Sequence, residues 1–302
     1  MTDGLPAPLI VDLDEVKRAR REIDPAFTNS PLFESAALSK QYGGRVILKL
    51  ETANPIGSFK GRGGDWLART ADHERPLACA SAGNLGQGLA YGARRAGIPL
   101  HVFASRSANP LKLARIKDLG ASLHLVDGDF DHAKNCAADQ AAKEDWRLIV
   151  DGEDRRLAEG AATIAAEITD AFADTIDLIF VPVGNGSLAC GVATWFKQHS
   201  QRTRIVGVSS TVAPATYNAW RSGVLEVGPS FTTIAEGLCA RTPRRVPLRV
   251  FETRLTTSSS FPKFASCLPR PHCGVPMASS PSHPGPRRSQ RLRVTPTCKA
   301  PR

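Results

Sequence analysis

A single lysine lies between two clusters of small residues near residue 60. The stretch NPIGSFKGRGG, residues 54–64, places Lys60 after Gly-Ser-Phe and shortly before three glycines. Glycine is favoured where the backbone bends sharply or approaches another group closely. A lysine amine becomes a nucleophile or a base when it is desolvated, because burial disfavours its charged form. We therefore interpret Lys60 as a candidate reactive amine in a tight turn, although a lone lysine is more often a solvated surface charge.

Two other loops have the composition of anion-binding turns. The stretch SAGNLGQG, residues 81–88, follows a short apolar run and precedes a helical pattern. The stretch VGNGSL, residues 183–188, has the same position after an apolar run at 177–184. Outward-pointing backbone amides and the helix dipole suit such junctions to an anion. Ordinary strand–helix turns carry the same residue types as caps, so neither loop is specific alone.

The combination of the three segments is more specific than any one of them. The second loop does not complete a G-x-G-x-x-G dinucleotide pattern, since Ala189 takes the last position, and no Gly-Lys-Ser/Thr follows. A reactive lysine, an anion-binding turn and a glycine-rich loop are what pyridoxal 5′-phosphate requires, because its aldehyde, ring and phosphate each need a partner. We predict pyridoxal 5′-phosphate as the cofactor.

The motifs together resemble the fold-type II pyridoxal-phosphate enzymes. The resemblance is strongest to the serine/threonine dehydratases (threonine ammonia-lyases) and the threonine synthases. It rests on the order and spacing of four motifs: NPIGSFKGRGG, SAGNLGQG, VGNGSL and TIAEGL (233–238). The resemblance covers roughly residues 25–241. It implies an α/β fold of two open, twisted parallel-sheet domains, similar to the tryptophan synthase β subunit.

The resemblance also implies roles for individual residues. Lys60 would form the Schiff base and carry protons in catalysis. The cofactor would be bound by Lys60, Phe59, Asn84, Gly184, Asn185, Gly186, Ser187, Leu188 and Gly237. The substrate carboxylate would be bound by Ser58, Ser81, Ala82, Gly83 and Asn84. Some relatives bind a divalent cation through a glutamate where this sequence has Ser209, so no metal site is expected.

The implied reaction is α,β-elimination of a hydroxy amino acid such as L-threonine or L-serine to a 2-oxo acid and ammonia. Two alternatives stay open. Threonine synthase-like or other β/γ-replacement chemistry is one, because the SFK motif is shared with threonine synthases and Leu85-Gly86 departs from the His-Ala common in dehydratases. A truncated, non-catalytic product is the other. The partners expected are a small amino-acid substrate and a second copy of the chain in a homodimer.

Alternating strand and helix patterns from residue 45 onward would position these loops. Strand patterns lie at 45–50, 76–81, 99–104, 121–126, 146–151, 177–184 and 203–210. Helix patterns lie at 61–73, 86–97, 110–120, 129–145, 157–172, 187–200 and 213–223. This alternation predicts βαβ units and parallel sheet, and the apolar run at 177–184 predicts a strand buried on both faces. We expect a small domain at 45–150 and a large cofactor-binding domain from 151–241 and residues 1–44, of which the stretch 21–35 reads mostly as connecting chain.

The net positive charge of the chain comes from residues 242–302. The chain has a net charge of +10, and this segment holds 12 of its 39 Lys/Arg but only one of its 29 acidic residues, Glu252. A solvated basic run is commoner than a nucleic-acid site, so no nucleic-acid partner is expected. The segment also holds 11 of the 22 prolines without any period, which predicts disorder. Because the strand–helix pattern and the family resemblance both end near residue 242, we hypothesise that the reading frame is shifted from there on. The large domain would then be incomplete and would lack a side chain to contact the pyridine nitrogen of the cofactor.

The remaining composition favours a cytoplasmic protein. The seven cysteines are scattered without a CxxC pair, which indicates neither a disulfide framework nor a zinc site. No apolar run approaches the roughly 20 residues of a membrane span, so no membrane partner is expected. The acidic start lacks the basic segment of a signal peptide.

Overall fold

A computed structural model describes residues 10–172, 176–228, 235–238, 240–241 and 243. The chain divides into two compact units, 1–261 and 262–302, and the second lies outside the described residues. The disorder predicted for 242–302 also falls outside them, apart from Pro243. In the part of the chain that is described, no helix is both long and apolar enough to cross a membrane.

The elements are α1 (Leu13–Glu22), β1 (Leu32–Glu34), α2 (Ala36–Tyr42), β2 (Ile47–Lys49), α3 (Lys60–Arg69), β3 (Leu77–Ala80), α4 (Asn84–Ala96), β4 (Leu100–Ser105), α5 (Pro110–Asp118), β5 (Ser122–Val126), α6 (Phe130–Lys143), β6 (Arg147–Ile149), α7 (Arg155–Ala171), β7 (Leu178–Pro182), α8 (Ser187–His199), β8 (Arg204–Val208), α9 (Ala215–Ser222) and the 3₁₀ turn η1 (Glu236–Leu238).

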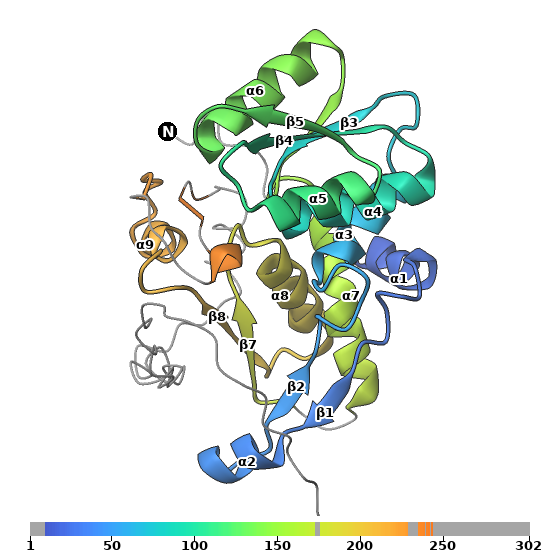
Figure 1. The fold of residues 1–302 in the computed structure, drawn as a ribbon. Helices are drawn as coiled ribbons and strands as arrows, with labels where there is room; N and C mark the ends of the chain where they lie inside the picture. The colour runs from blue at the N-terminus through green and yellow to red at the C-terminus, as the bar shows by residue number, and fades with distance from the viewer. Residues whose placement is uncertain (1–9, 173–175, 229–234, 239, 242, 244–302) are drawn as a thin grey trace, which may run out of the picture. The chain divides into compact units, whose positions relative to one another are not determined.

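Four strands form a parallel sheet in the order β5-β4-β3-β6. Helix α6 lies on one face of this sheet, and α4 and α5 lie on the other (Figure 1). Leu77, Leu89, Val102 and Ile116 are buried between the strands and the helices. The α/β class predicted from the alternating pattern is therefore confirmed.

The strand predicted at 45–50 does not join the parallel sheet. It is present as β2, which pairs antiparallel with β1. The N-terminal residues contain α1, β1 and α2, which the sequence patterns did not predict, whereas the stretch 21–35, expected to be mostly connecting chain, holds only the end of α1 and β1. Asp12 caps α1 by accepting the amides of Asp14 and Glu15, and Val16 is buried against α7. Helix α1 thus has a capping carboxylate at its start and one face buried in the core, which together stabilise a surface helix.

Strands β7 and β8 form a parallel pair that is covered on one face. Val181 and Ile205 point into the core that α7 and α8 cover. Phe180 and Val208 are each 42% exposed. The prediction of a strand buried on both faces is thus wrong for the described residues, because side chains alternate along a strand and only one of the two faces meets helices.

Helix α3 packs closely between α4 and α7. The glycines after Lys60, which the sequence suggested as part of a tight turn, lie inside this helix. A Cβ atom on Gly64 would come within 2.2 Å of the carbonyl oxygen of Gly88 on α4, and one on Gly63 within 2.7 Å of a backbone oxygen on α7. The sharp bend itself is at Gly57, whose φ is +65°. The small residues therefore bring helix backbones together rather than turn the chain.

Candidate active site

Lys60 is the first residue of α3 and follows a turn that Asn54 holds together. The Asn54 side-chain oxygen accepts the amides of Ile56 and Ser58 at 3.2 and 3.1 Å, and its nitrogen donates to the Glu51 carbonyl at 2.8 Å. Ser58 Oγ accepts the amide of Lys60 at 3.3 Å. These bonds fix the backbone from which the lysine side chain projects. Asn54 is a residue that sequence reasoning missed, although Asn is a common turn residue for this reason.

The Lys60 amine meets the glycine-rich loop at one carboxylate, that of Asp151. Lys60 Nζ lies 2.8 Å from both oxygens of Asp151, which follows β6. Asn185 Nδ2 donates to the same carboxylate at 3.0 Å and Ser187 Oγ at 2.8 Å. The structure therefore brings together three residues predicted for the site. Asp151 itself was missed, and its only sequence signal is a carboxylate directly after a short strand.

The charge of Asp151 is set by its surroundings. Burial of the carboxyl acts to raise its pKa, but the Lys60 charge and hydrogen bonds from Lys60, Asn185 and Ser187 outweigh burial and lower the pKa below its usual value. The carboxylate is therefore ionised near neutral pH. The ammonium also lies 5.0 Å from the ring centre of Phe59, within cation–π range.

The glycine-rich loop leads from β7 into α8. Helix α8 begins at Ser187 and has no side-chain N-cap, and Gly186 precedes it at φ +99°. Its first amides are therefore not bonded to a capping side chain, which suits them to an anion. Leu188 is turned into the core. A Cβ on Gly184 would lie 2.4 Å from the carbonyl oxygen of Gly237, so the predicted ring-flanking residue adjoins this loop.

The loop at 81–84 leads from β3 into α4. Ser81 Oγ accepts the amides of Gly83 and Gly86 at 3.2 and 3.1 Å, so its hydroxyl caps the helix. Ala82 and Gly83 are half-buried and Asn84 is exposed. Within the described residues, no hydrogen bond joins this loop to Lys60. The two segments nevertheless adjoin, because a Cβ on Gly88, in the second turn of α4, would lie 2.5 Å from the Lys60 carbonyl oxygen.

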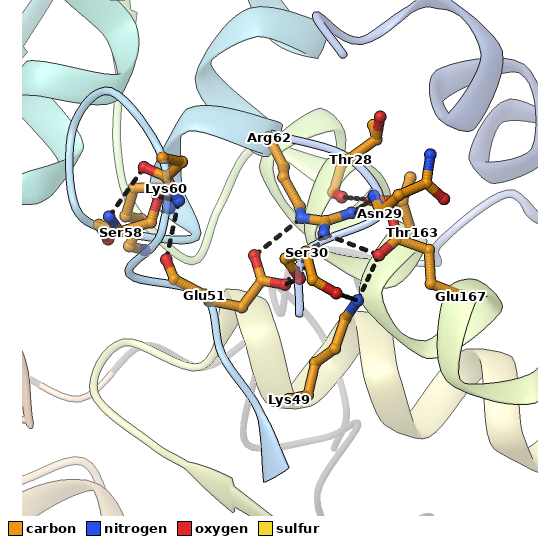
Figure 2. Close-up of polar contacts among 12 residues, drawn as sticks. Thr28, Asn29, Ser30, Lys49, Glu51, Ser58, Lys60, Arg62, Thr163 and Glu167 are labelled. Atoms are coloured by element: carbon orange, nitrogen blue, oxygen red, sulfur yellow. Dashed lines mark hydrogen bonds and ion pairs between the residues drawn. The ribbon is translucent and has the colours of Figure 1, made fainter. Parts of the chain in front are cut away.

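A buried charge network anchors α3 directly after the candidate lysine, and the sequence did not indicate it. Arg62 is fully buried, with Nε 2.9 Å from Glu51 Oε2 and Nη1 2.6 Å from Glu167 Oε1. Thr163 Oγ1 accepts a further bond from Nη1 at 2.9 Å. Lys49 Nζ lies 2.5 Å from Glu167 Oε2, so two cations balance two carboxylates. Figure 2 shows Arg62 between Glu51 and Glu167.

The site fits an aldehyde cofactor that carries a phosphate. The Lys60 amine and Ser187, at the open N-terminus of α8, both bond the Asp151 carboxylate, and Gly184 leaves no room for a side chain. Ser209 Oγ, just beyond β8, is buried and has no hydrogen-bond partner among the described residues. The same residues include no group of three or more His, Cys, Asp or Glu side chains arranged to hold a metal ion.

Comparison with known proteins gives consistent matches. The family model described as "Pyridoxal-phosphate dependent enzyme" matches residues 23–260. The L-threonine ammonia-lyase of Thermotoga maritima is 30% identical over 78% of this chain, and the L-serine dehydratase/L-threonine deaminase of Bos taurus is 30% identical over 75%. The chain spans 59% and 71% of the lengths of these two relatives.

Solved structures agree with the sequence matches. Threonine deaminase isoform 2 of Solanum lycopersicum superposes with a TM-score of 0.74 at 26% identity, over 84% of this chain and 78% of that one. A second threonine deaminase, from T.th., gives a TM-score of 0.75 at 25% identity, over 82% and 80%. The resemblance predicted from the lysine, asparagine and glycine-rich motifs is confirmed, as are the fold class and the cofactor type.

Proposed function

Because the chain belongs to the family of pyridoxal-phosphate-dependent enzymes, we propose that it catalyses α,β-elimination of a hydroxy amino acid, L-threonine or L-serine, to a 2-oxo acid and ammonia. The observation that carries the proposal is the meeting of Lys60 with Asn185 and Ser187 at one carboxylate. The proposal is supported because this amine lies beside the uncapped start of α8, which suits an anion. The relatives named threonine ammonia-lyase and serine dehydratase support the choice of substrate.

We assign roles to the residues of the site as follows. Lys60 binds the cofactor covalently and is the catalytic base. Phe59, Asn84, residues 184–188 and Gly237 bind the ring and the phosphate. Ser58 and residues 81–84 bind the substrate carboxylate, with the start of α4 contributing its dipole.

The reaction makes definite demands on these residues. The bound cofactor supplies an electron sink that stabilises negative charge at the substrate Cα. Lys60 Nζ takes the Cα proton, for which the amine must be uncharged. The substrate carboxylate is held at the start of α4, so that its Cα faces the amine. The β-hydroxyl takes up the proton that Lys60 Nζ has removed and leaves as water, and the enamine product adds a further water to give the 2-oxo acid and ammonia.

We also propose the domain division and the setting. The small domain is 45–150, which contains the four-stranded sheet, and the large one is 151–241 with residues 1–44, which contains β7 and β8. The protein is cytoplasmic and acts on a small amino acid as a homodimer. Size-exclusion chromatography with light scattering tests the dimer, and a monomeric mass would contradict it.

Spectroscopy and product release test the function on the full chain. With pyridoxal phosphate added, the protein should show the absorbance of a lysine-linked cofactor and release ammonia and a 2-oxo acid from L-threonine or L-serine. Lys60→Ala should abolish both, whereas Lys17→Ala, at an exposed ion pair on α1, should change neither. A folded protein without cofactor absorbance would overturn the proposal. Cofactor binding without turnover of any amino acid would instead favour a non-catalytic binding protein.

A further inference from the structure

Asp151 contacts Lys60 directly, yet the roles proposed above give this carboxylate no function. Its two oxygens each lie 2.8 Å from Lys60 Nζ, and the two side chains are only 13% and 15% exposed. A pair that is this close and largely shielded from water interacts far more strongly than an exposed one. The carboxylate is therefore a substantial part of the electrostatic environment of the candidate catalytic nitrogen.

The contacts around Asp151 require an acceptor and fix its orientation. Lys60, Asn185 and Ser187 all donate to it, and Ser187 Oγ in turn accepts the amide of Gly152 at 3.1 Å. An ionised carboxylate only accepts hydrogen bonds, so it satisfies all these donors at once. An asparagine in its place would turn an NH₂ group toward another donor. The site is thus built for a negative charge at this position.

We propose that Asp151 is a positioning residue for the proposed cofactor-binding lysine: it is the counter-ion of the Lys60 nitrogen, both as the free ammonium and when that nitrogen is linked to the cofactor. The inference rests on the role of Lys60 proposed above. Linking the amine to the cofactor aldehyde forms a carbon–nitrogen double bond, releases the aldehyde oxygen as water, and leaves a nitrogen that binds one proton. A carboxylate beside this nitrogen stabilises its protonated, positive form.

Most other charged groups near the pair in sequence are bonded to different partners. The first two turns of α4 and of α8 contain no charged side chain, only Tyr91 and Cys190 as titratable groups. Asp154 pairs with Arg147, and Arg155 Nε lies 3.5 Å from Glu159 Oε1. Within the described residues, Lys60 is the only cation that forms an ion pair with Asp151. Other charges in this region are Arg156, whose pKa burial and neighbouring arginines lower, and the exposed Glu153.

A pH titration of the holoenzyme tests the proposal through the cofactor spectrum. Protonated and unprotonated forms of the lysine-linked cofactor absorb at different wavelengths, so the transition between them has a measurable midpoint. An opposite charge within about 4 to 6 Å shifts such a midpoint by about 1 to 3 pH units. Asp151→Asn should therefore lower the midpoint by about that amount, or roughly 10- to 1,000-fold in proton affinity.

Three further variants complete the experiment. Asp151→Ser is also uncharged and is smaller, and it should lower the midpoint too. It serves as the neutral variant if Asp151→Asn fails to fold. Asp151→Glu keeps the charge and should stay nearer to the wild-type midpoint than the neutral variants. Asp145→Asn is the matched control, because Asp145 is exposed and its φ of +55° suits asparagine. Its midpoint should equal that of the wild type.

The outcomes separate this inference from the function on which it rests. A neutral variant that binds the cofactor with the wild-type midpoint would overturn the counter-ion role alone. A glutamate variant that behaves like the neutral ones would do the same. If the wild type shows no lysine-linked cofactor, or if Lys60→Ala retains it, the proposed function itself is wrong.

Discussion

Replacing Arg62 with methionine tests whether the buried charge network anchors α3. The guanidinium is fully buried and bonds Glu51 and Glu167, and among the described residues the only other cation in the network is Lys49. Methionine occupies comparable space without charge, so two carboxylates would share one ammonium. Removing one partner of a buried ion pair costs about 3 to 5 kcal/mol, because a buried charge is left uncompensated. That is a large part of the roughly 5 to 15 kcal/mol by which domains are stable.

Urea unfolding of the full chain, followed by tryptophan fluorescence, measures this loss. The matched control is Arg75→Met, since Arg75 pairs with Asp145 at 45% and 84% exposure. Such an exposed pair contributes about 0.2 to 1 kcal/mol. Adding Glu51→Gln to the Arg62 variant removes one uncompensated charge and should recover part of the loss. If Arg62→Met loses no more free energy of unfolding than the control, the network does not stabilise α3 and the reasoning fails.

The difference in free energy of unfolding between the wild type and Arg62→Met should depend on pH. Burial acts to raise the pKa of Glu167, but the hydrogen bond and charge of Arg62 prevail and hold it below its usual value. A carboxyl whose pKa is lower when folded contributes stability above its unfolded pKa of about 4.3, and loses it as pH falls through the folded value. The difference between wild type and Arg62→Met should thus be full at neutral pH and shrink in acid. A difference that grows on acidification would contradict the assignment.

Three further predictions concern packing, capping and thiol reactivity. Gly64→Ala should cost about 1 to 3 kcal/mol in urea unfolding, because its Cβ would meet a backbone carbonyl of α4 at 2.2 Å, whereas Gly44→Ala, with nothing within 4 Å, should cost nothing. An equal cost at both positions would exclude close helix packing. Ser81→Ala should cost about 0.5 to 2 kcal/mol, since two amides at the start of α4 lose their acceptor, and no cost would mean that water replaces the hydroxyl. Burial raises the pKa of Cys79 to about 12, so mass spectrometry of the native protein should find its thiol unmodified by a thiol reagent while the half-buried Cys136 reacts. Equal labelling would contradict this burial.

Much of the architecture was determined by short-range patterns in the sequence. The strands and helices from β3 to α9 lie close to their predicted ranges, because capping residues such as Asn109 and Asp129 and stop residues such as Gly97 act within a few positions of themselves. Lys60 and the glycine-rich loop were found for the same reason, since each motif is contiguous. Their detailed roles stay proposals.

Tertiary structure alone decided which distant residues complete the site. Asp151 is 91 positions from Lys60, and Glu167 is 105 positions from Arg62, so no local pattern links them. The antiparallel pairing of β2 was likewise not encoded in its own residues, because it depends on where β1 lies. The glycines after Lys60 could equally make a turn or a close helix contact, and only the neighbouring backbones of α4 and α7 settle the matter. Local sequence specifies backbone conformation and candidate chemistry, whereas burial and charge pairing arise only when separate elements pack together.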